Sequence, residues 1–171
     1  MKYLLYRKKG IKGACEGCED LNIISFRPTP VKLATVGESV SIKVRFVRLM
    51  FFLLTRGKAY ILCVKNDHNQ IVHTSYVIPK CSKFSFMAKE DWEIGPCITA
   101  PESRGQGIYP KGLNYVTSHT KDQNTYFYML VAPDNAPSIR GIEKAGFELF
   151  GEAEKYGTFS KYRLVKGKTN E

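Results

Sequence analysis

The stretch Pro101-Glu102-Ser103-Arg104-Gly105-Gln106-Gly107-Ile108 decides the fold of this chain. An apolar segment, residues 97–99, precedes it, and a segment with helical spacing, residues 109–117, follows it. Glycines let a backbone come close to a ligand, and the free N–H groups at a helix start point at an anion. Arg104 adds a planar cation that suits phosphate oxygens. The stretch therefore predicts a strand, a glycine-rich turn and a helix that together hold a phosphorylated cofactor.

Length and composition indicate one globular domain. The 171 residues are 43% hydrophobic and 25% charged, which is ordinary for a single domain with a real core. We expect residues 1–171 to form that domain, with residues 166–171 as a disordered tail. The net charge of +10 attracts polyanions without choosing among them, and it fits simple solubility equally well.

The five cysteines indicate free thiols in a reducing compartment. Cys15 and Cys18 form half of a zinc or redox signature, but no second pair follows and no histidine pair has ligand spacing. We therefore expect no metal site and two thiols in a surface turn. Residues 1–6 do not resemble a secretory signal, and the most apolar stretch, residues 44–54, is too short to span a bilayer. The sequence predicts a cytoplasmic protein without membrane contact.

Hydrophobic periodicity predicts the order of the elements. We expect a strand at 21–26, a helix at 38–55, a hairpin of 59–65 and 70–78, a strand at 92–99, a helix at 108–117, an apolar strand at 125–131, a helix at 138–144, and last strands at 147–150 and 159–165. In the first helix Val40, Val44, Val47, Phe51 and Leu54 recur at helical spacing. The fold class is α/β, an α+β mixed sheet of six or seven strands flanked by helices. Strands 92–99 and 125–131 should be parallel neighbours with a right-handed crossover.

Gly95-Pro96 interrupts the strand that feeds the glycine loop. Glycine weakens a strand and proline cannot donate to its ladder, so the pair indicates a bulge or a point where pairing stops. A bulge here would splay the strand from residues 125–131 and leave the backbone of 97–99 to bond a ligand. An ordinary irregularity of an edge strand is the alternative.

Taken together, these residues resemble the GCN5-related N-acetyltransferase (GNAT) family. The phosphate-loop pattern of that family, Arg/Gln-x-x-Gly-x-Gly/Ala, is similar to the run from Arg104 to Tyr109. A second signature, an Asn that opens a short helix ending in Lys-x-Gly-Phe, is similar to Asn135-Ala136-Pro137-Ser138 followed by Lys144-Ala145-Gly146-Phe147. The resemblance is clearest over residues 91–150.

The resemblance implies transfer of an acetyl group from acetyl-CoA, as co-substrate, to a primary amine by direct attack. It places the pyrophosphate on the amides of residues 105–109 and the pantetheine arm along residues 97–99. The cofactor-binding residues it implies are Cys97, Ile98, Thr99, Arg104, Gly105, Gln106, Gly107, Ile108, Tyr109, Asn135 and Ser138. A backbone N–H near Cys97 or Ile98 would polarise the thioester carbonyl.

The chain departs from the family pattern at two positions. The last small residue of the loop is Tyr109 here, whose side chain must point away from the cofactor or line the substrate cleft. The family's frequent tyrosine acid, four residues before the final glycine, is Ile142 here, so the role of general acid is vacant. Tyr109, Tyr115 and Tyr128 are candidate proton donors, although most such aromatics simply pack.

Glu93 is the candidate general base, because a carboxylate just before the bulge could take the proton of the amine. A solvated or ion-paired glutamate is the alternative. His73 is a second candidate base, since a neutral imidazole suits proton transfer near pH 7, but it fits a core or surface position as well. Cys97 has no histidine beside it in sequence and is interpreted as a small core residue.

The acceptor is the least defined part of the prediction. The expected substrate side is basic and favours an anionic acceptor; its cations are Arg45, Arg48, Lys80, Lys83 and Lys89. The runs Gly95-Pro96-Cys97 and Gly107-Ile108-Tyr109-Pro110 look similar to small acetyltransferases that act on nucleotide-linked amino sugars. A small amine, an amino acid and a protein N-terminus remain open.

A protein of the same fold that binds coenzyme A or RNA without catalysis is the competing class. No RNA-binding motif is present, and the sequence predicts no nucleic-acid partner. The apolar helix face at Phe51-Phe52 leaves a homodimer open.

Overall fold

The computed structural model describes residues 2–15, 17–34, 41–81, 84–120, 124–157 and 161–167. One mixed sheet of eight strands runs through them in the order β2-β3-β4-β5-β6-β1-β7-β8. Along the chain the elements are β1 (Lys2–Lys9), β2 (Asn22–Phe26), α1 (Ile42–Thr55), β3 (Tyr60–Lys65), β4 (Ile71–Pro79), β5 (Trp92–Thr99), the short 3-10 helix η1 (Pro101–Ser103), α2 (Ile108–Ser118), β6 (Tyr126–Val131), α3 (Ala136–Lys144), β7 (Glu148–Tyr156) and β8 (Lys161–Gly167).

The mixed α/β fold and the order of elements are confirmed. The hairpin of β3 and β4, the strand β5 and the helices α2 and α3 all lie where the sequence predicts them, and β5 and β6 are parallel neighbours. Predicted residues 38–40 at the start of α1 lie outside the described residues. Lys166 and Gly167 belong to β8 instead of a disordered tail, because they pair with β7; residues 168–171 are not described.

The strand β1 is absent from the prediction and accounts for a sheet of eight strands instead of six or seven. It lies between β6 and β7 and pairs antiparallel with both, and Leu5 at its centre is fully buried. Its last three residues are Arg7, Lys8 and Lys9. Three consecutive cations hide the alternation of a strand, although two of them pack against other groups in the fold.

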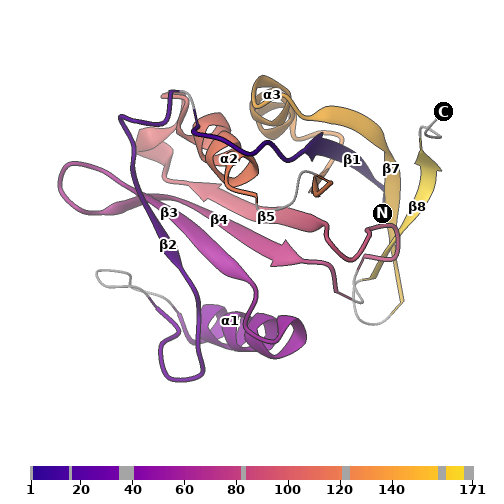
Figure 1. The fold of residues 1–171 in the computed structure, drawn as a ribbon, viewed down its shortest axis with the longest axis horizontal. Coiled ribbons are helices and arrows are strands. Elements are labelled where there is room, and N and C mark those ends of the chain that lie inside the picture. Colours follow the sequence, from indigo (N-terminus) through magenta and orange to yellow (C-terminus); the bar gives the residue numbers. More distant parts are fainter. Residues whose placement is uncertain are drawn as a thin grey trace.

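The helices lie on both faces of the sheet. Figure 1 shows α2 and α3 on one side and α1 on the other. Under α2 and α3 the core contains Ile94, Leu113, Phe127 and Ile142, whereas Tyr128 packs with Leu5, Phe84 and Met87 in a second cluster. Because successive residues of a strand point to opposite faces, the neighbours Phe127 and Tyr128 show that these clusters lie on opposite sides of the sheet.

Helix α1 packs on the sheet through a buried arginine. Ser41 caps its start, since Oγ accepts a hydrogen bond from the backbone N–H of Val44 at 3.4 Å. Arg48 is 2% exposed; its Nε donates to the hydroxyl of Tyr76 at 3.1 Å and its Nη1 to the carbonyl of Leu33 at 2.9 Å. The apolar stripe that the sequence indicates does not face the sheet as a whole, because Val47 and Leu54 are exposed.

The expectation of free thiols at Cys15 and Cys18 is wrong. The two residues form a disulfide, and their Cα atoms lie 5.6 Å apart, a separation that a disulfide can bridge. The turn between them contains Gly17, whose φ of +73° is one that glycine adopts freely. Cys63, Cys81 and Cys97 form no disulfide. Among the described residues no group of three metal-ligating side chains gathers, and no described helix has the length and apolar character to cross a bilayer.

A polar network lies in the core beneath α2. The Nδ1 atom of His73 lies 2.7 Å from Oγ1 of Thr99, and its Nε2 atom lies 2.8 Å from Oγ of Ser75. The hydroxyl of Ser75 donates to the thiol sulfur of Cys97 at 3.2 Å. The network therefore joins the side chains of β4 to those of β5. Burial lowers the pKa of His73 from 6.5 to about 4, so the ring is neutral near pH 7.

We predict that His73 makes the stability of the fold depend on pH. The unfolded chain binds a proton at His73 below about pH 6.5, whereas the folded chain does so only near pH 4. The unfolded state thus binds more protons in this window, and the free energy of unfolding should fall by about 3 kcal/mol from pH 6.5 to pH 4. Urea unfolding of the wild type and of His73→Gln at several pH values measures this contribution. Equal pH slopes for the two proteins would contradict it.

Candidate functional site

A bulge in β5 separates this strand from β6. Ser75 lies opposite Cys97 and Val77 opposite Ile94. Gly95 and Pro96 of β5 therefore lie together opposite one residue of β4, the residue between Ser75 and Val77. The Gly95–Pro96 peptide is cis, and Gly95 has a φ of +154°. Strands β5 and β6 are paired at two positions, where Trp92 lies opposite Phe127 and Glu93 opposite Tyr128. The predicted bulge and splay are therefore confirmed, and the β6 side of residues 97–99 is left outside this ladder.

The glycine loop turns directly from the end of β5 into α2. Gly105 and Gly107 have φ of +79° and +77°, values that favour glycine, and a Cβ at either position would meet open space. Gly107 is the N-cap residue of α2. The first N–H groups of a helix have no partner within it, so those of Ile108 and Tyr109 stand where an anion can bind.

Arg104 is held beside this loop by the strand before it. Its Nε donates to the carbonyl of Thr99 at 3.1 Å, and the residue is exposed. On the next turn of the loop, the amide nitrogen of Gln106 donates to the carbonyl of Glu102 at 3.2 Å. These bonds orient both side chains without burying them. The loop therefore offers backbone N–H groups and a guanidinium at one place.

The large side chain of Tyr109 lies between α2, α3 and the sheet. Its ring centroid is 5.8 Å from that of His73, and a Cβ on Gly141 would lie only 2.4 Å from its Cδ1 atom. Burial, and secondarily the thiol of Cys97, raises the pKa of Tyr109. The ring thus points inward, toward the part of β5 that has separated from β6. Ile142, where the family pattern has a tyrosine, is buried in the core.

The residues of the second family signature lie at the start and at the end of α3. Asn135 is the N-cap residue, and its Oδ1 accepts a hydrogen bond from the backbone N–H of Ser138 at 3.2 Å. Gly146 follows the helix with a φ of +76°. Asn135 is exposed and Ser138 is half-buried. Asn135 therefore has a structural role as a helix cap, which leaves its exposed side chain within reach of a ligand.

Glu93 lies at the last step of the β5–β6 ladder. It is 6% exposed, and its Oε1 atom lies 3.4 Å from the position that a Cβ of Gly95 would take. Its carboxylate acts electrostatically on two neighbours: it contributes to the raised pKa of Cys97 and to that of Tyr162, in both cases after burial, which is the largest cause. A carboxylate thus stands at the point where the two strands separate.

The other candidate acid–base residues lie elsewhere or have structural partners. His73 has both ring nitrogens in the core network and does not face the ladder end. Tyr115 stacks on His119, with ring centroids 4.1 Å apart, near the C-terminus of α2. Tyr128 is the ladder partner of Glu93, and its ring packs in the cluster on the face opposite α2. Tyr109 lies close enough to Cys97 of the separated strand for this thiol to affect its pKa.

Sequence reasoning missed the link between Cys97 and a histidine. No histidine adjoins Cys97 in sequence, but Ser75 connects it to His73 across the β4–β5 ladder. The alternation of His73, Ser75 and Val77 on one face of β4 is the signal that could have revealed this. Burial raises the pKa of the Cys97 thiol to about 12, so it remains protonated and fits the predicted role of a packing residue.

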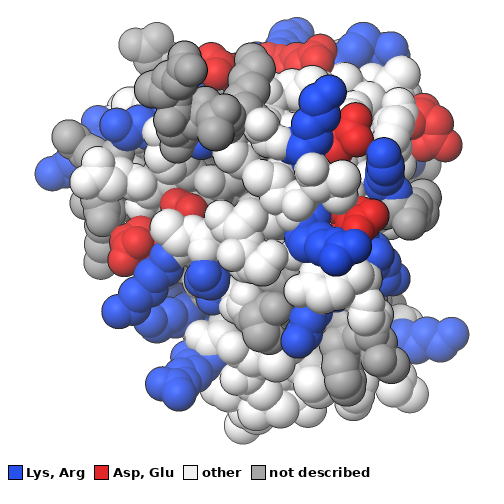
Figure 2. All heavy atoms as spheres, turned by 90° about the vertical axis from the view of Figure 1, so that its right-hand side faces the viewer, with Lys and Arg blue, Asp and Glu red and all other residues white. Residues whose placement is uncertain are grey.

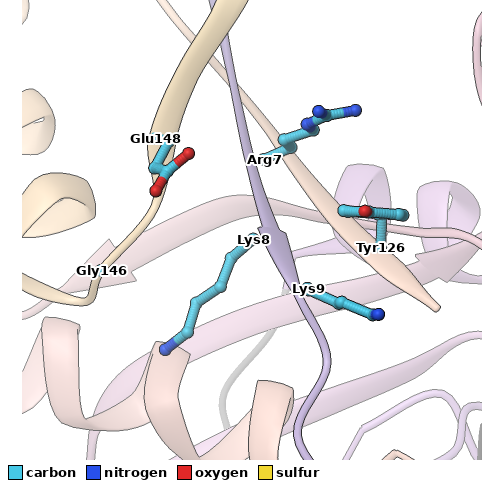
Figure 3. Close-up of a pocket in the computed structure, with 6 residues that line it drawn as sticks. All are labelled: Arg7, Lys8, Lys9, Tyr126, Gly146 and Glu148. Carbon is cyan, nitrogen blue, oxygen red and sulfur yellow. The ribbon is translucent and has the colours of Figure 1, made fainter. Parts of the chain in front are cut away.

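Two hollows of the surface lie away from the loop. The first, of about 230 Å³, lies between β1 and β7; Figure 3 shows Lys8 extending from it toward α2, away from Arg7 and Lys9. Lys8 donates to Oδ1 of Asn114 at 2.8 Å and to the carbonyl of Ala145 at 2.7 Å, so this cation stabilises the fold. The second, of about 420 Å³, lies at the start of β5 beside Trp92 and His119.

The expected basic substrate side is only partly present. Arg48 is buried and bonded to Tyr76, Lys80 donates to the carbonyl of Met87, and Lys83 lies outside the described residues. Arg45 and Lys89 are exposed. Figure 2 shows basic side chains spread over this view of the molecule with acidic ones among them. The positive charge therefore does not gather into one substrate patch there.

Comparison with known proteins agrees with this geometry. The sequence model of the acetyltransferase (GNAT) family matches residues 47–147. No curated protein matches the chain at a significant level.

Solved structures of similar fold share little sequence with the chain. A GNAT-family acetyltransferase from Colwellia psychrerythraea is 18% identical with a TM-score of 0.58 over 86% of this chain and 52% of that one. A GCN5-related N-acetyltransferase from Sphaerobacter thermophilus is 16% identical with a TM-score of 0.56, over 88% of this chain and 49% of that one. A putative GNAT acetyltransferase from Novosphingobium aromaticivorans is 16% identical with a TM-score of 0.54, over 89% of this chain and 62% of that one. The chain thus spans about half to three-fifths of their length. The family match over residues 47–147, with the splayed strands and glycine loop inside it, shows that this chain belongs to the GNAT acetyltransferase family.

Proposed function

We propose that this chain transfers an acetyl group from acetyl-CoA to the primary amine of a small molecule by direct attack. The observation that carries the proposal is the joining of two features on β5: the strand leaves β6 after Glu93, and it ends in the loop that opens α2. A pantetheine arm can pair with the free side of a strand, and a pyrophosphate suits the N–H groups that follow it.

The residues that would hold acetyl-CoA fit its chemistry. Open space at Gly105 and Gly107 lets phosphate oxygens approach the backbone, and the N–H groups of Ile108 and Tyr109 begin a helix. Arg104 adds a charged partner, and Gln106 lies beside it. On the strand, the backbone of Cys97, Ile98 and Thr99 would face the pantetheine amides. Asn135 and Ser138 would contact the cofactor from the start of α3.

Glu93 is the proposed general base. The amine that attacks the thioester carbonyl must lose a proton as the new C–N bond forms. Glu93 stands where β5 and β6 separate, so its carboxylate can take that proton directly or through a water molecule. The backbone N–H near Cys97 or Ile98 would stabilise the oxygen of the carbonyl as it becomes negative, an effect worth about 3 kcal/mol.

Tyr109 is the proposed general acid. When the C–S bond breaks, the thiolate of coenzyme A needs a proton, and Ile142 cannot supply one. The ring of Tyr109 lies against Gly141 of α3, one residue from Ile142, and near Cys97 of β5. The hydroxyl is protonated near pH 7 and can donate a hydrogen bond to the leaving sulfur, although burial raises its pKa and makes it a weaker acid than an exposed tyrosine.

The proposed acceptor is a small amine. The resemblance of two short runs of the sequence to other small acetyltransferases favours a nucleotide-linked amino sugar. A cytoplasmic location belongs to the same proposal: Cys63, Cys81 and Cys97, which form no disulfide, fit it, whereas the Cys15–Cys18 disulfide does not. A homodimer through Phe51 and Phe52 gains no support, because both side chains are half-buried: Phe51 lies 6.0 Å from the ring of Tyr76.

We predict that Arg104→Ala weakens acetyl-CoA binding about tenfold, since it removes a charged partner of the phosphates. Titration of wild type and variant with acetyl-CoA by calorimetry measures the dissociation constants. Arg163→Ala is the matched control, because it removes an exposed arginine of β8 that pairs with Glu154. A wild type that shows no binding, and no thermal stabilisation by acetyl-CoA, would sink the proposed function.

Glu93→Gln is expected to lower kcat about 10²-fold or more while the dissociation constant of acetyl-CoA stays unchanged, because the amide cannot accept the proton. Release of free thiol over a panel of amines and nucleotide-linked amino sugars finds the acceptor and measures the rate. An unchanged kcat removes Glu93 from the mechanism.

Tyr109→Phe is expected to lower kcat about tenfold or more without weakening acetyl-CoA binding, because the ring still packs on His73 and only the hydroxyl is lost. Tyr115→Phe, in the same helix but stacked on His119, is the matched control and should retain full activity. Equal rates for both variants show that another group protonates the sulfur.

A further inference from the structure

Helix α1 exposes an apolar face to its surroundings. Among the described residues, six of the twelve large apolar side chains that are exposed belong to this one helix. They are Ile42 (85% exposed), Phe46 (63%), Leu53 (58%), Leu54 (58%), Val47 (46%) and Met50 (36%). Positions 42, 46, 50 and 53 recur at helical spacing and form one stripe. Contiguous exposed apolar side chains of this kind mark an interaction surface.

The charges of α1 are all positive. Between Ser41 and Lys58 the sequence contains Lys43, Arg45, Arg48, Arg56 and Lys58 and no acidic residue. Arg48 is buried against Tyr76 and Leu33, whereas Lys43, Arg45 and Arg56 are exposed. The apolar stripe is thus accompanied by cations, and a negatively charged partner complements it.

The helix lies at the rim of the molecule. In Figure 1 it lies below the sheet, apart from α2 and α3, and the lower end of Figure 2 is mostly uncharged with basic side chains at its sides. Its inner face meets the sheet through Arg48 and through Phe51, which packs on Tyr76. The apolar stripe faces away from those contacts and is exposed.

A second copy of the chain fits this surface poorly. A helix of 14 residues is about 21 Å long and about 10 Å wide, so its outer face offers only a few hundred Å², below the ~800 Å² per partner of a stable interface. A two-fold contact through this helix would also bring Lys43 and Arg45 of both copies together. A flat surface with negative charge meets neither obstacle.

In contrast to the expectation of no membrane contact drawn from the sequence, we propose that α1 binds the surface of an anionic lipid bilayer. The helix lies parallel to the membrane plane, with Phe46, Met50 and Leu53 inserted among the headgroups and acyl chains. Lys43, Arg45 and Arg56 contact the lipid phosphates. This is the mode of an interfacial amphipathic helix, which needs no spanning segment. The inference is independent of the acetyl-transfer reaction, since α1 contributes no residue to the loop or the ladder end.

Sedimentation with vesicles tests the proposal on the full chain. We expect binding to vesicles of equimolar phosphatidylcholine and phosphatidylglycerol, and at least tenfold weaker binding to phosphatidylcholine alone. Raising the salt concentration should weaken binding, because the lysine and arginine contacts are screened. Absence of binding to the anionic vesicles overturns the proposal in favour of a protein partner.

Paired variants separate α1 from the general positive charge of the chain. The double variant Phe46→Gln/Leu53→Gln should bind anionic vesicles at least tenfold more weakly. The matched control, Leu149→Gln/Val165→Gln, changes two exposed apolar residues of β7 and β8 and should bind like the wild type. All four side chains are exposed, and circular dichroism checks that each protein folds. Equal binding by the two variants overturns the proposal, as does a wild-type dimer in analytical ultracentrifugation that only the α1 variant dissociates.

Discussion

The end of the β5–β6 ladder at Glu93 and Tyr128 is the constraint on which the rest of the site depends. Gly95-Pro96 adds a residue to β5, so this strand keeps its pairing with β4 while it leaves β6. Backbone groups inside a sheet normally find partners, and a strand that lacks them on one side is completed by water or by a ligand. Because the glycine loop follows on the same strand, one bulge places both halves of the proposed cofactor site.

The separated half of β5 keeps its position because β4 holds it with side chains as well as backbone. A chain of hydrogen bonds crosses the two strands beyond the bulge and beneath α2. It runs from Thr99 to His73, then to Ser75 and Cys97. A buried network whose members are all bonded specifies one arrangement, whereas apolar packing alone tolerates sliding. His73 therefore contributes to the site indirectly, by fixing the strand on which the backbone of Cys97 and Ile98 is presented.

The predictable parts of this fold are those with a local backbone requirement. Gly95-Pro96 at the bulge, Gly105 and Gly107 in the loop, and Asn135 as the cap of α3 each leave a residue signature, and the structure bears out each local feature. β1 and the outer face of α1 were not predictable in this way. The cations of β1 are bonded by distant residues such as Asn114, and α1 turns Arg48 inward because Tyr76 and Leu33 accept its hydrogen bonds. Such partners exist only once the chain has folded.

Tyr109 and Ile142, the two departures from the family pattern, are connected in space. The ring of Tyr109 would collide with α3 if position 141 carried a side chain, since a Cβ there would lie 2.4 Å from its Cδ1 atom. Gly141 removes that collision, and Ile142 fills the core beside it. The ring of Tyr109 from α2 thus lies beside the position on α3 where the family pattern has a tyrosine. The two departures are 33 residues apart in the sequence. The contact of the Tyr109 ring with Gly141 brings them together in the fold.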